Sequence, residues 1–115
     1  MPLTVVEYVR KDGTRPYQAW FDELPPPAAA KVATARARLE MGNTSPVKWI
    51  GAIGEYRIDW GPGYRIYLAK DGKDSMVLLG GGTKQRQQAD IERAQILWAE
   101  YKARKAAASK SWRRR

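Results

Sequence analysis

The chain has 115 residues with a formal net charge of +9, and it contains neither cysteine nor histidine. That length fits one domain without disulfides, and the missing thiols and imidazoles exclude cysteine nucleophiles, histidine bases and the usual zinc sites, so we expect no metal and no cofactor. No run of eighteen apolar residues occurs, and the amino terminus has no long apolar stretch. We therefore expect no signal peptide and no membrane span, which favours a cytoplasmic protein.

The first part of the chain predicts one strand followed by two helices. Leu3–Arg10 is rich in β-branched and aromatic side chains, which indicates a buried strand. Pro16–Leu24 begins with a proline suited to a first helical turn and has its aromatic residues at helical spacing. After three prolines, Ala28–Met41 carries a thin, alanine-rich apolar stripe. The two helices should form a hairpin that packs closely against a sheet.

The middle of the chain predicts a strand meander. A short extended piece at Val47–Ile50 precedes three expected strands, at Glu55–Trp60, Tyr64–Ala69 and Ser75–Leu79. Together with a helix at the end of the chain, this order predicts an α+β fold in which an antiparallel-rich sheet carries helices on one face.

The carboxyl-terminal part predicts one helix and a basic tail. Apolar residues recur at helical spacing from about Lys84 to Tyr101. Residues 102–115 contain seven of the 21 basic residues and no acid, so residues 1–101 carry a net charge of only +2. Because the tail lacks a sustained apolar face, we expect a flexible segment after a single domain of residues 1–101. A specific nucleic-acid site must therefore come from how the domain arranges its few cations.

The segment EYRIDWGPGYRIYL, residues 55–68, repeats Tyr-Arg-Ile on both sides of Gly-Pro-Gly. With the turn centred on the proline, Asp59 pairs with Arg65, and alternation places Arg57, Asp59, Arg65 and Tyr67 on one polar face. Arg57 and Arg65 are then diagonal neighbours that could converge on one phosphate. The competing interpretation is an ordinary solvated face, on which Asp59 relieves the repulsion between the arginines.

Further cations flank this hairpin in the sequence. Residues 80–86, GGGTKQR, bring Lys84 and Arg86 to a helix start, where free amides and the helix dipole favour anions. Three glycines alone indicate only a flexible loop. Lys48 could flank an RNA groove, although a solvated loop is the simpler explanation. The core should contain the tryptophans Trp20, Trp60 and Trp98.

Three segments together, DGTRPYQAWFDEL, EYRIDWGPGYRIYL and GGGTKQRQQADIERAQILWAEYK, resemble the RelE/ParE superfamily of type II toxin–antitoxin toxins, within its HigB-like branch of addiction module killer proteins. The resemblance implies two N-terminal helices on a curved antiparallel-rich sheet with a C-terminal helix. It also implies a concave face that holds mRNA in the ribosomal A site, and a HigA-like helix-turn-helix antitoxin as partner. In the nuclease members, cations occupy the positions of Arg57, Arg65 and Lys84. Two positions depart from that pattern, with Asp59 replacing a cation and Asp90 lying near a family tyrosine.

Such a site implies mRNA cleavage by attack of the substrate's own 2′-hydroxyl, which requires charge stabilisation and two proton transfers. Arg57 and Arg65 suit the phosphate, and Lys84 suits the leaving oxygen. The proton-transfer group stays open among Asp59, Asp90, Lys84 and Tyr67. Tyr67 could instead stack on an RNA base or be an ordinary sheet-surface aromatic. The alternatives for the whole protein are a ParE-like poison of DNA gyrase and an inactive or purely nucleic-acid-binding module.

Overall fold

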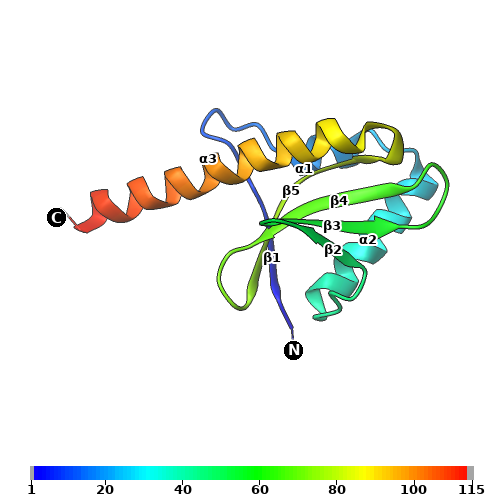
Figure 1. Cartoon of the computed structure of the whole chain (residues 1–115), viewed down its shortest axis with the longest axis horizontal. Coiled ribbons are helices and arrows are strands. Elements are labelled where there is room, and N and C mark those ends of the chain that lie inside the picture. The colour runs from blue at the N-terminus through cyan, green and yellow to red at the C-terminus, as the bar shows by residue number, and fades with distance from the viewer. Residues whose placement is uncertain (1, 114–115) are drawn as a thin grey trace.

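The computed structural model describes residues 2–113 and has an α+β fold, as Figure 1 shows. In chain order the elements are β1 (Thr4–Glu7), α1 (Pro16–Asp22), α2 (Pro26–Glu40), β2 (Val47–Ile50), β3 (Ile53–Ile58), β4 (Tyr64–Lys70), β5 (Ser75–Thr83), a 3-10 turn (Lys84–Arg86) and α3 (Gln87–Arg113). The strands lie in the order β1-β5-β4-β3-β2, and every pair is antiparallel except β1 with β5. The predicted α+β class and antiparallel-rich sheet are confirmed.

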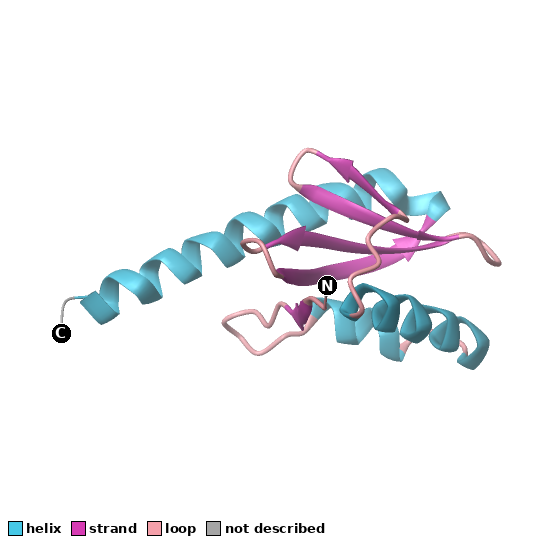
Figure 2. Cartoon of the chain, turned by 90° about the horizontal axis from the view of Figure 1, so that it is seen from below, coloured by secondary structure: helices cyan, strands magenta, loops and turns pink. Residues whose placement is uncertain are grey.

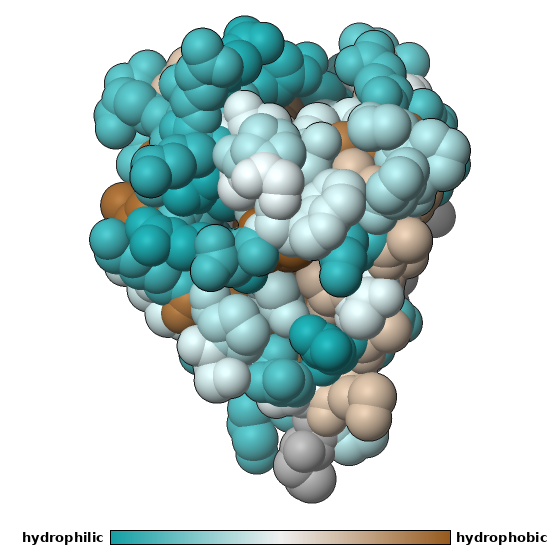
Figure 3. Space-filling model, turned by 90° about the vertical axis from the view of Figure 1, so that its right-hand side faces the viewer, coloured by the Kyte–Doolittle hydropathy of each residue, from teal (hydrophilic) through white to brown (hydrophobic). Residues whose placement is uncertain are grey.

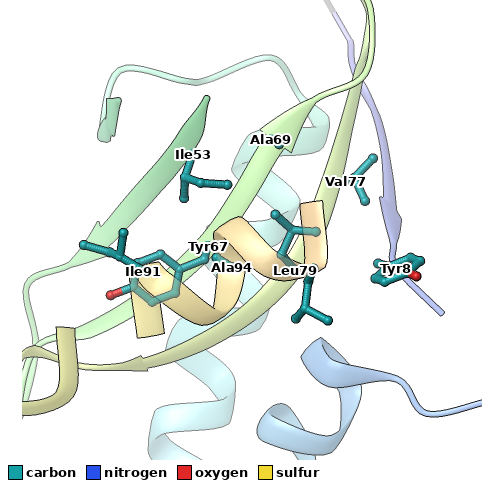
Figure 4. Packing of buried hydrophobic residues seen from close by; sticks show 9 residues of the cluster. Tyr8, Ile53, Tyr67, Ala69, Val77, Leu79, Ile91 and Ala94 are labelled. Atoms are coloured by element: carbon teal, nitrogen blue, oxygen red, sulfur yellow. The ribbon is translucent and has the colours of Figure 1, made fainter. Parts of the chain in front are cut away.

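Helices cover both faces of the sheet, as the view in Figure 2 helps to show. One face packs Ile66 and Leu68 of β4 against α1 and α2, and the other packs Tyr67 of β4 against Ile91 and Ala94 of α3 (Figure 4). The prediction of helices on one face was wrong, because the chain leaves β5 and returns across the opposite face as α3. The hairpin face that carries the two arginines therefore lies beside the start of α3.

Several boundaries differ from the prediction. The three glycines do not form the expected flexible loop, because they pair with β4 and extend β5 to Thr83. Helix α2 begins at Pro26 rather than Ala28, since prolines fit the first helical turn, where amide donors have no partner within the helix. Strand β1 is shorter than predicted and lies at the edge of the sheet, with Val6 43% exposed. It is therefore an edge strand that is only half buried.

Helix α3 continues through most of the segment that was predicted to be flexible, reaching Arg113, while Arg114 and Arg115 lie outside the described residues. Alanine, lysine and arginine are strong helix formers, and they dominate this stretch. Contacts with the domain also hold it. Arg104 Nη1 donates to the carbonyl oxygen of Val9 at 2.7 Å, and Lys105 Nζ contacts Asp71 at 2.7 Å. Figure 1 shows α3 projecting past the sheet.

These contacts predict where the chain can be shortened. A chain ending at Lys105 should keep the thermal stability of the full chain, because its anchoring contacts remain. A chain ending at Tyr101 loses the Arg104 and Lys105 contacts, and its free energy of unfolding should fall by about 0.5–2 kcal/mol. Thermal unfolding of the two truncated chains measures the difference. Equal stability of both would mean that the contacts of Arg104 and Lys105 contribute nothing.

A close approach between β5 and α1 gives a second stability prediction. A Cβ placed on Gly81 would overlap the indole ring of Trp20. We expect Gly81→Ala to lower the free energy of unfolding by about 1–3 kcal/mol, as overpacking does in a close-packed interior. Urea denaturation measures this cost. Adding Trp20→Leu should recover part of it, whereas a Gly81→Ala variant as stable as the parent would contradict the packing described.

Among residues 2–113 we find no helix with the length and apolar character needed to cross a membrane.

Candidate active site

Arg57 of β3 and Arg65 of β4 lie directly opposite each other on adjacent strands. The predicted register was wrong by two residues, because Ile58 rather than Trp60 pairs with Tyr64. A shift of two residues preserves the alternation of faces, so the two arginines still share one face. Asp59 does not oppose Arg65, because it lies outside β3 in the exposed loop.

The hairpin loop is longer than predicted because it contains two tight turns. The amide of Trp60 donates to the carbonyl oxygen of Ile58 at 2.9 Å, and the amide of Gly63 donates to that of Trp60 at 3.1 Å. Gly61 and Gly63 have φ angles of 58° and 78°, a region that glycine adopts at little cost. The glycines on both sides of the proline therefore close the loop before residue 64 and set the register.

A fully buried carboxylate, Glu55, lies beside the arginine pair. Arg57 Nε donates to Glu55 Oε1 at 2.7 Å, and Arg65 Nε is 3.5 Å from the same oxygen. The other oxygen, Oε2, accepts from Gln87 Nε2 at 2.8 Å and from the Tyr67 hydroxyl at 3.3 Å. Groups from β3, β4 and α3 therefore share one carboxylate, which we call the Glu55 cluster.

Glu55 offsets part of the positive charge of the cluster, since one carboxylate faces two guanidinium groups. Burial acts to raise the pKa of Glu55, but hydrogen bonds from Arg57 and Gln87 and the charge of Arg65 outweigh it and lower the pKa overall. Burial, with the nearby charges of Glu55 and Asp90, raises the pKa of Tyr67. Glu55 is thus ionised at neutral pH, and Tyr67 is a neutral phenol that donates a hydrogen bond rather than accepting a proton.

The two arginines differ in what they offer a ligand. The Arg57 side chain is 46% exposed, and within residues 2–113 its terminal nitrogens have no hydrogen-bond partner. The Arg65 side chain is only 8% exposed, and its Nη1 donates to the carbonyl oxygen of Gly63 at 2.8 Å. The same carbonyl accepts the backbone amide of Lys84 at 3.0 Å, which brings Lys84 beside Arg65. Arg57 and Lys84 are therefore the accessible cations, and Arg65 is held in place between strands.

Arg57 and Arg65 form a row across the strands, which we call the arginine row, and Asp90 lies at its end beside Arg65. Arg65 pairs across the strands with Gly82, and a Cβ on Gly82 would overlap the Asp90 carboxylate. Burial raises the pKa of Asp90, and the charges of Arg86 and Arg93 only partly offset that effect. Its buried Oδ2 atom has no hydrogen-bond partner in the described part of the chain. Of the proposed proton-transfer groups, Asp90 is therefore the carboxyl whose surroundings favour its protonated form.

A cavity of about 340 Å³ opens beside Asp90 between α1 and α3. Arg86 and Arg93 line it together with Trp20 and the backbone of Gly80 and Gly81. A Cβ on Gly80 would meet no atom within 4 Å, whereas the indole of Trp20 lies directly over Gly81.

The remaining predicted residues lie around this row. Tyr67 does not have a free ring for stacking on a base: it is 1% exposed and packs beneath α3 against Ile91 and Ala94 (Figure 4), so that role was wrong. Lys48 pairs with Glu55 across β2 and β3 and is exposed at that edge of the sheet. Arg86 is exposed in the 3-10 turn.

Two members of the Glu55 cluster, Glu55 and Gln87, were not predicted from the sequence. Glu55 had a usable signal, since it precedes Arg57 by two residues and alternation places both on one face. Gln87 had no comparable signal, because its position depends on where the 3-10 turn ends and α3 begins. The relief of arginine repulsion that we expected from Asp59 comes from Glu55 instead.

The fold and site together define a small α+β protein in which a buried glutamate partly neutralises a pair of arginines. No family model matches the sequence. A protein of Haemophilus influenzae, described as an uncharacterized protein, is 37% identical to the chain over 86 residues, which cover 73% of this chain and 87% of the Haemophilus protein. The chain belongs to the same family as that protein.

Proposed function

We propose that the chain is the toxin of a type II toxin–antitoxin system, a HigB-like, ribosome-dependent mRNA endonuclease. The observation that supports this most is the row of Arg57 and Arg65 across two adjacent strands, with Lys84 and Asp90 beside it. The sequence resemblance to the RelE/ParE superfamily supplies the reaction and the partners. In this proposal the protein acts in the cytoplasm on mRNA in the ribosome, and a HigA-like antitoxin neutralises it.

The reaction transfers a phosphoryl group within the RNA, from the 5′-oxygen to the neighbouring 2′-oxygen. The 2′-oxygen forms a bond to phosphorus while the bond from phosphorus to the 5′-oxygen breaks, which leaves a 2′,3′-cyclic phosphate and a 5′-hydroxyl. One proton passes from the 2′-hydroxyl to a base supplied by the ribosome or by water, and one passes from an acid of the toxin to the 5′-oxygen. The transition state places extra charge on the phosphate oxygens, so fixed cations accelerate it.

The geometry suggests a role for each residue. Arg57 offers its terminal nitrogens to the phosphate, and Glu55 fixes its guanidinium through Nε. Lys84 supplies a second charge, while Arg65 adds positive potential from a buried position. Asp90 is the candidate acid for the 5′-oxygen, because burial raises its pKa. Tyr67 is left as a hydrogen-bond donor to Glu55.

Primer extension after brief expression tests this function. We expect new 5′ ends within translated reading frames, with hydroxyl termini, and no such ends when the ribosomes are kept off the message. Growth arrest with intact mRNA would contradict the proposal.

A second candidate is a ParE-like toxin that poisons DNA gyrase. The observation in its favour is that Glu55 neutralises part of the arginine pair and Arg65 is nearly buried, which weakens the cationic face. A gyrase-dependent DNA cleavage assay on the same purified protein separates the two. Accumulation of cleaved DNA without mRNA cleavage would favour this candidate.

A further inference from the structure

A groove of about 310 Å³ lies between α2 and the tip of the β3–β4 hairpin. Its lining includes Lys31, Thr34, Arg38, Arg57, Asp59 and Trp60. Figure 3 views this end of the molecule, where hydrophilic side chains cover most of the surface and a paler, less polar patch interrupts them. Ala35, Pro46, Tyr56 and Ile58 complete the lining, so charged and apolar side chains share the groove. Its exposed aromatic ring is Trp60, since Tyr56 is buried.

Trp60 is not a core residue as predicted, because it lies in the hairpin loop and is 38% exposed. Its ring stacks on that of Tyr64 with 6.2 Å between centroids and an interplanar angle of 24°. Lys31 Nζ lies 5.9 Å from the Trp60 ring centroid. Tyr64 is buried, so it fixes an exposed indole at the rim of the groove.

The charge of the groove favours an anionic ligand. Three cations, Lys31, Arg38 and Arg57, line it with one acid, Asp59. Arg57 lines the groove and also belongs to the arginine row of the candidate active site. The groove lies on the α2 face of the sheet and the row on the α3 face, and the two meet at the edge of β3, where β2 no longer pairs beyond Tyr56. An aromatic ring among cations, continuous with a phosphate-binding row, is the arrangement that binds single-stranded nucleic acid without sequence preference.

We propose that this groove holds a nucleotide next to the scissile phosphate, with its base stacked on Trp60 and its phosphate bound by Lys31 and Arg38. This inference rests on the proposed function, because it extends the RNA path beyond the reacting phosphate. The flexible Lys31 side chain moves from the indole to the phosphate when the base enters. The groove is a binding subsite, and no step of the reaction takes place in it.

The test compares two exposed tryptophans in cleavage of mRNA on programmed ribosomes. Trp49 is a matched control, since it is 39% exposed and has Lys70 Nζ 5.2 Å from its ring centroid, but it lies on β2. We expect Trp60→Ala to raise the half-saturating toxin concentration by roughly 5- to 100-fold, the range for loss of one base–aromatic stack. The rate at saturation should change little. Trp49→Ala should behave like the parent, and Trp60→Phe should recover most of the affinity.

A second measurement alters the RNA and compares its effect on the parent and on Trp60→Ala. An mRNA with an abasic nucleotide beside the scissile phosphate should bind the parent toxin as weakly as the intact mRNA binds Trp60→Ala, and Trp60→Ala should not distinguish the two messages. An equal abasic penalty in parent and variant would overturn the subsite, as would equal effects of the two alanine substitutions.

The possible results of these experiments distinguish failure of the proposed subsite from failure of the proposed nuclease function. Normal cleavage by Trp60→Ala with weakened antitoxin binding would make the groove a protein-docking surface and overturn the proposal. A parent protein that cleaves no mRNA would overturn the proposed nuclease function and the subsite with it.

Discussion

Replacing Arg57 by alanine should reduce mRNA cleavage on the ribosome by on the order of 10²-fold or more, comparable to removal of one oxyanion donor. Arg57 is the half-exposed member of the arginine pair, with terminal nitrogens free for a phosphate in the described part of the chain. Primer extension and single-turnover cleavage of ribosome-bound mRNA measure the effect. Arg57→Lys should recover only part of the rate, because lysine keeps the charge but not the paired donors.

The matched control for this experiment is Lys73→Ala. Lys73 is an exposed cation in the turn between β4 and β5, so its removal changes the net charge by the same amount. We expect near-normal cleavage by Lys73→Ala. A folded Arg57→Ala protein that cleaves at the parent rate would remove the arginine row from the mechanism.

Removal of the Glu55 carboxylate should cost more stability than any other single change described above. Glu55→Ala leaves the nearly buried Arg65 without its counter-charge, and breaking a buried ion pair in this way costs about 3–5 kcal/mol. That is a large fraction of the stability of a small domain. Urea denaturation at neutral pH measures the loss, and Asp74→Ala, at an exposed acid, should leave the free energy of unfolding almost unchanged.

We also expect the stability difference between the parent and Glu55→Ala to depend on pH in a defined direction. The pKa of Glu55 is lower in the folded protein than the unfolded value of 4.5, so the ionised carboxylate stabilises the fold above that value. This stabilisation is lost as the pH falls through the folded pKa. The gap between the parent and Glu55→Ala should therefore narrow as acid is added below about pH 4.5. A gap that stays constant on acidification would contradict the ionised state that we assign to Glu55.

Alternation along the hairpin was enough to predict which side chains share a face. It placed Arg57 and Arg65 on one face together with Tyr67, and the structure has them there, opposite the face on which Ile66 packs against α1 and α2. Register could not be predicted in the same way, because Gly61 and Gly63 allow several loop lengths that preserve the alternation. The partner of the arginines changed from Asp59 to Glu55 for this reason.

The burial of the site depended on tertiary packing that no local pattern contains. Tyr67 reads as a surface aromatic from its own strand, and only the return of α3 across that face buries it. Residues 102–113 have few apolar residues at helical spacing, so the pattern did not predict a helix there. The helix is stabilised by intrinsic helix propensity and by contacts with Val9 and Asp71. Helix propensity and long-range contacts, rather than hydrophobic spacing, therefore determine the structure of residues 102–113.

The pairing of the first strand with the last has a consequence for the order of folding. β1 pairs with β5, and the hydroxyl of Tyr8 donates to Glu100, 92 residues further along the chain. Contacts so distant in sequence slow folding, because a long loop must close before they form. During synthesis β1 can pair with β5 only after Leu78 has been made, and the Glu55 cluster can form only after Gln87 has been made. A nascent chain therefore lacks the finished site until the start of α3 has left the ribosome.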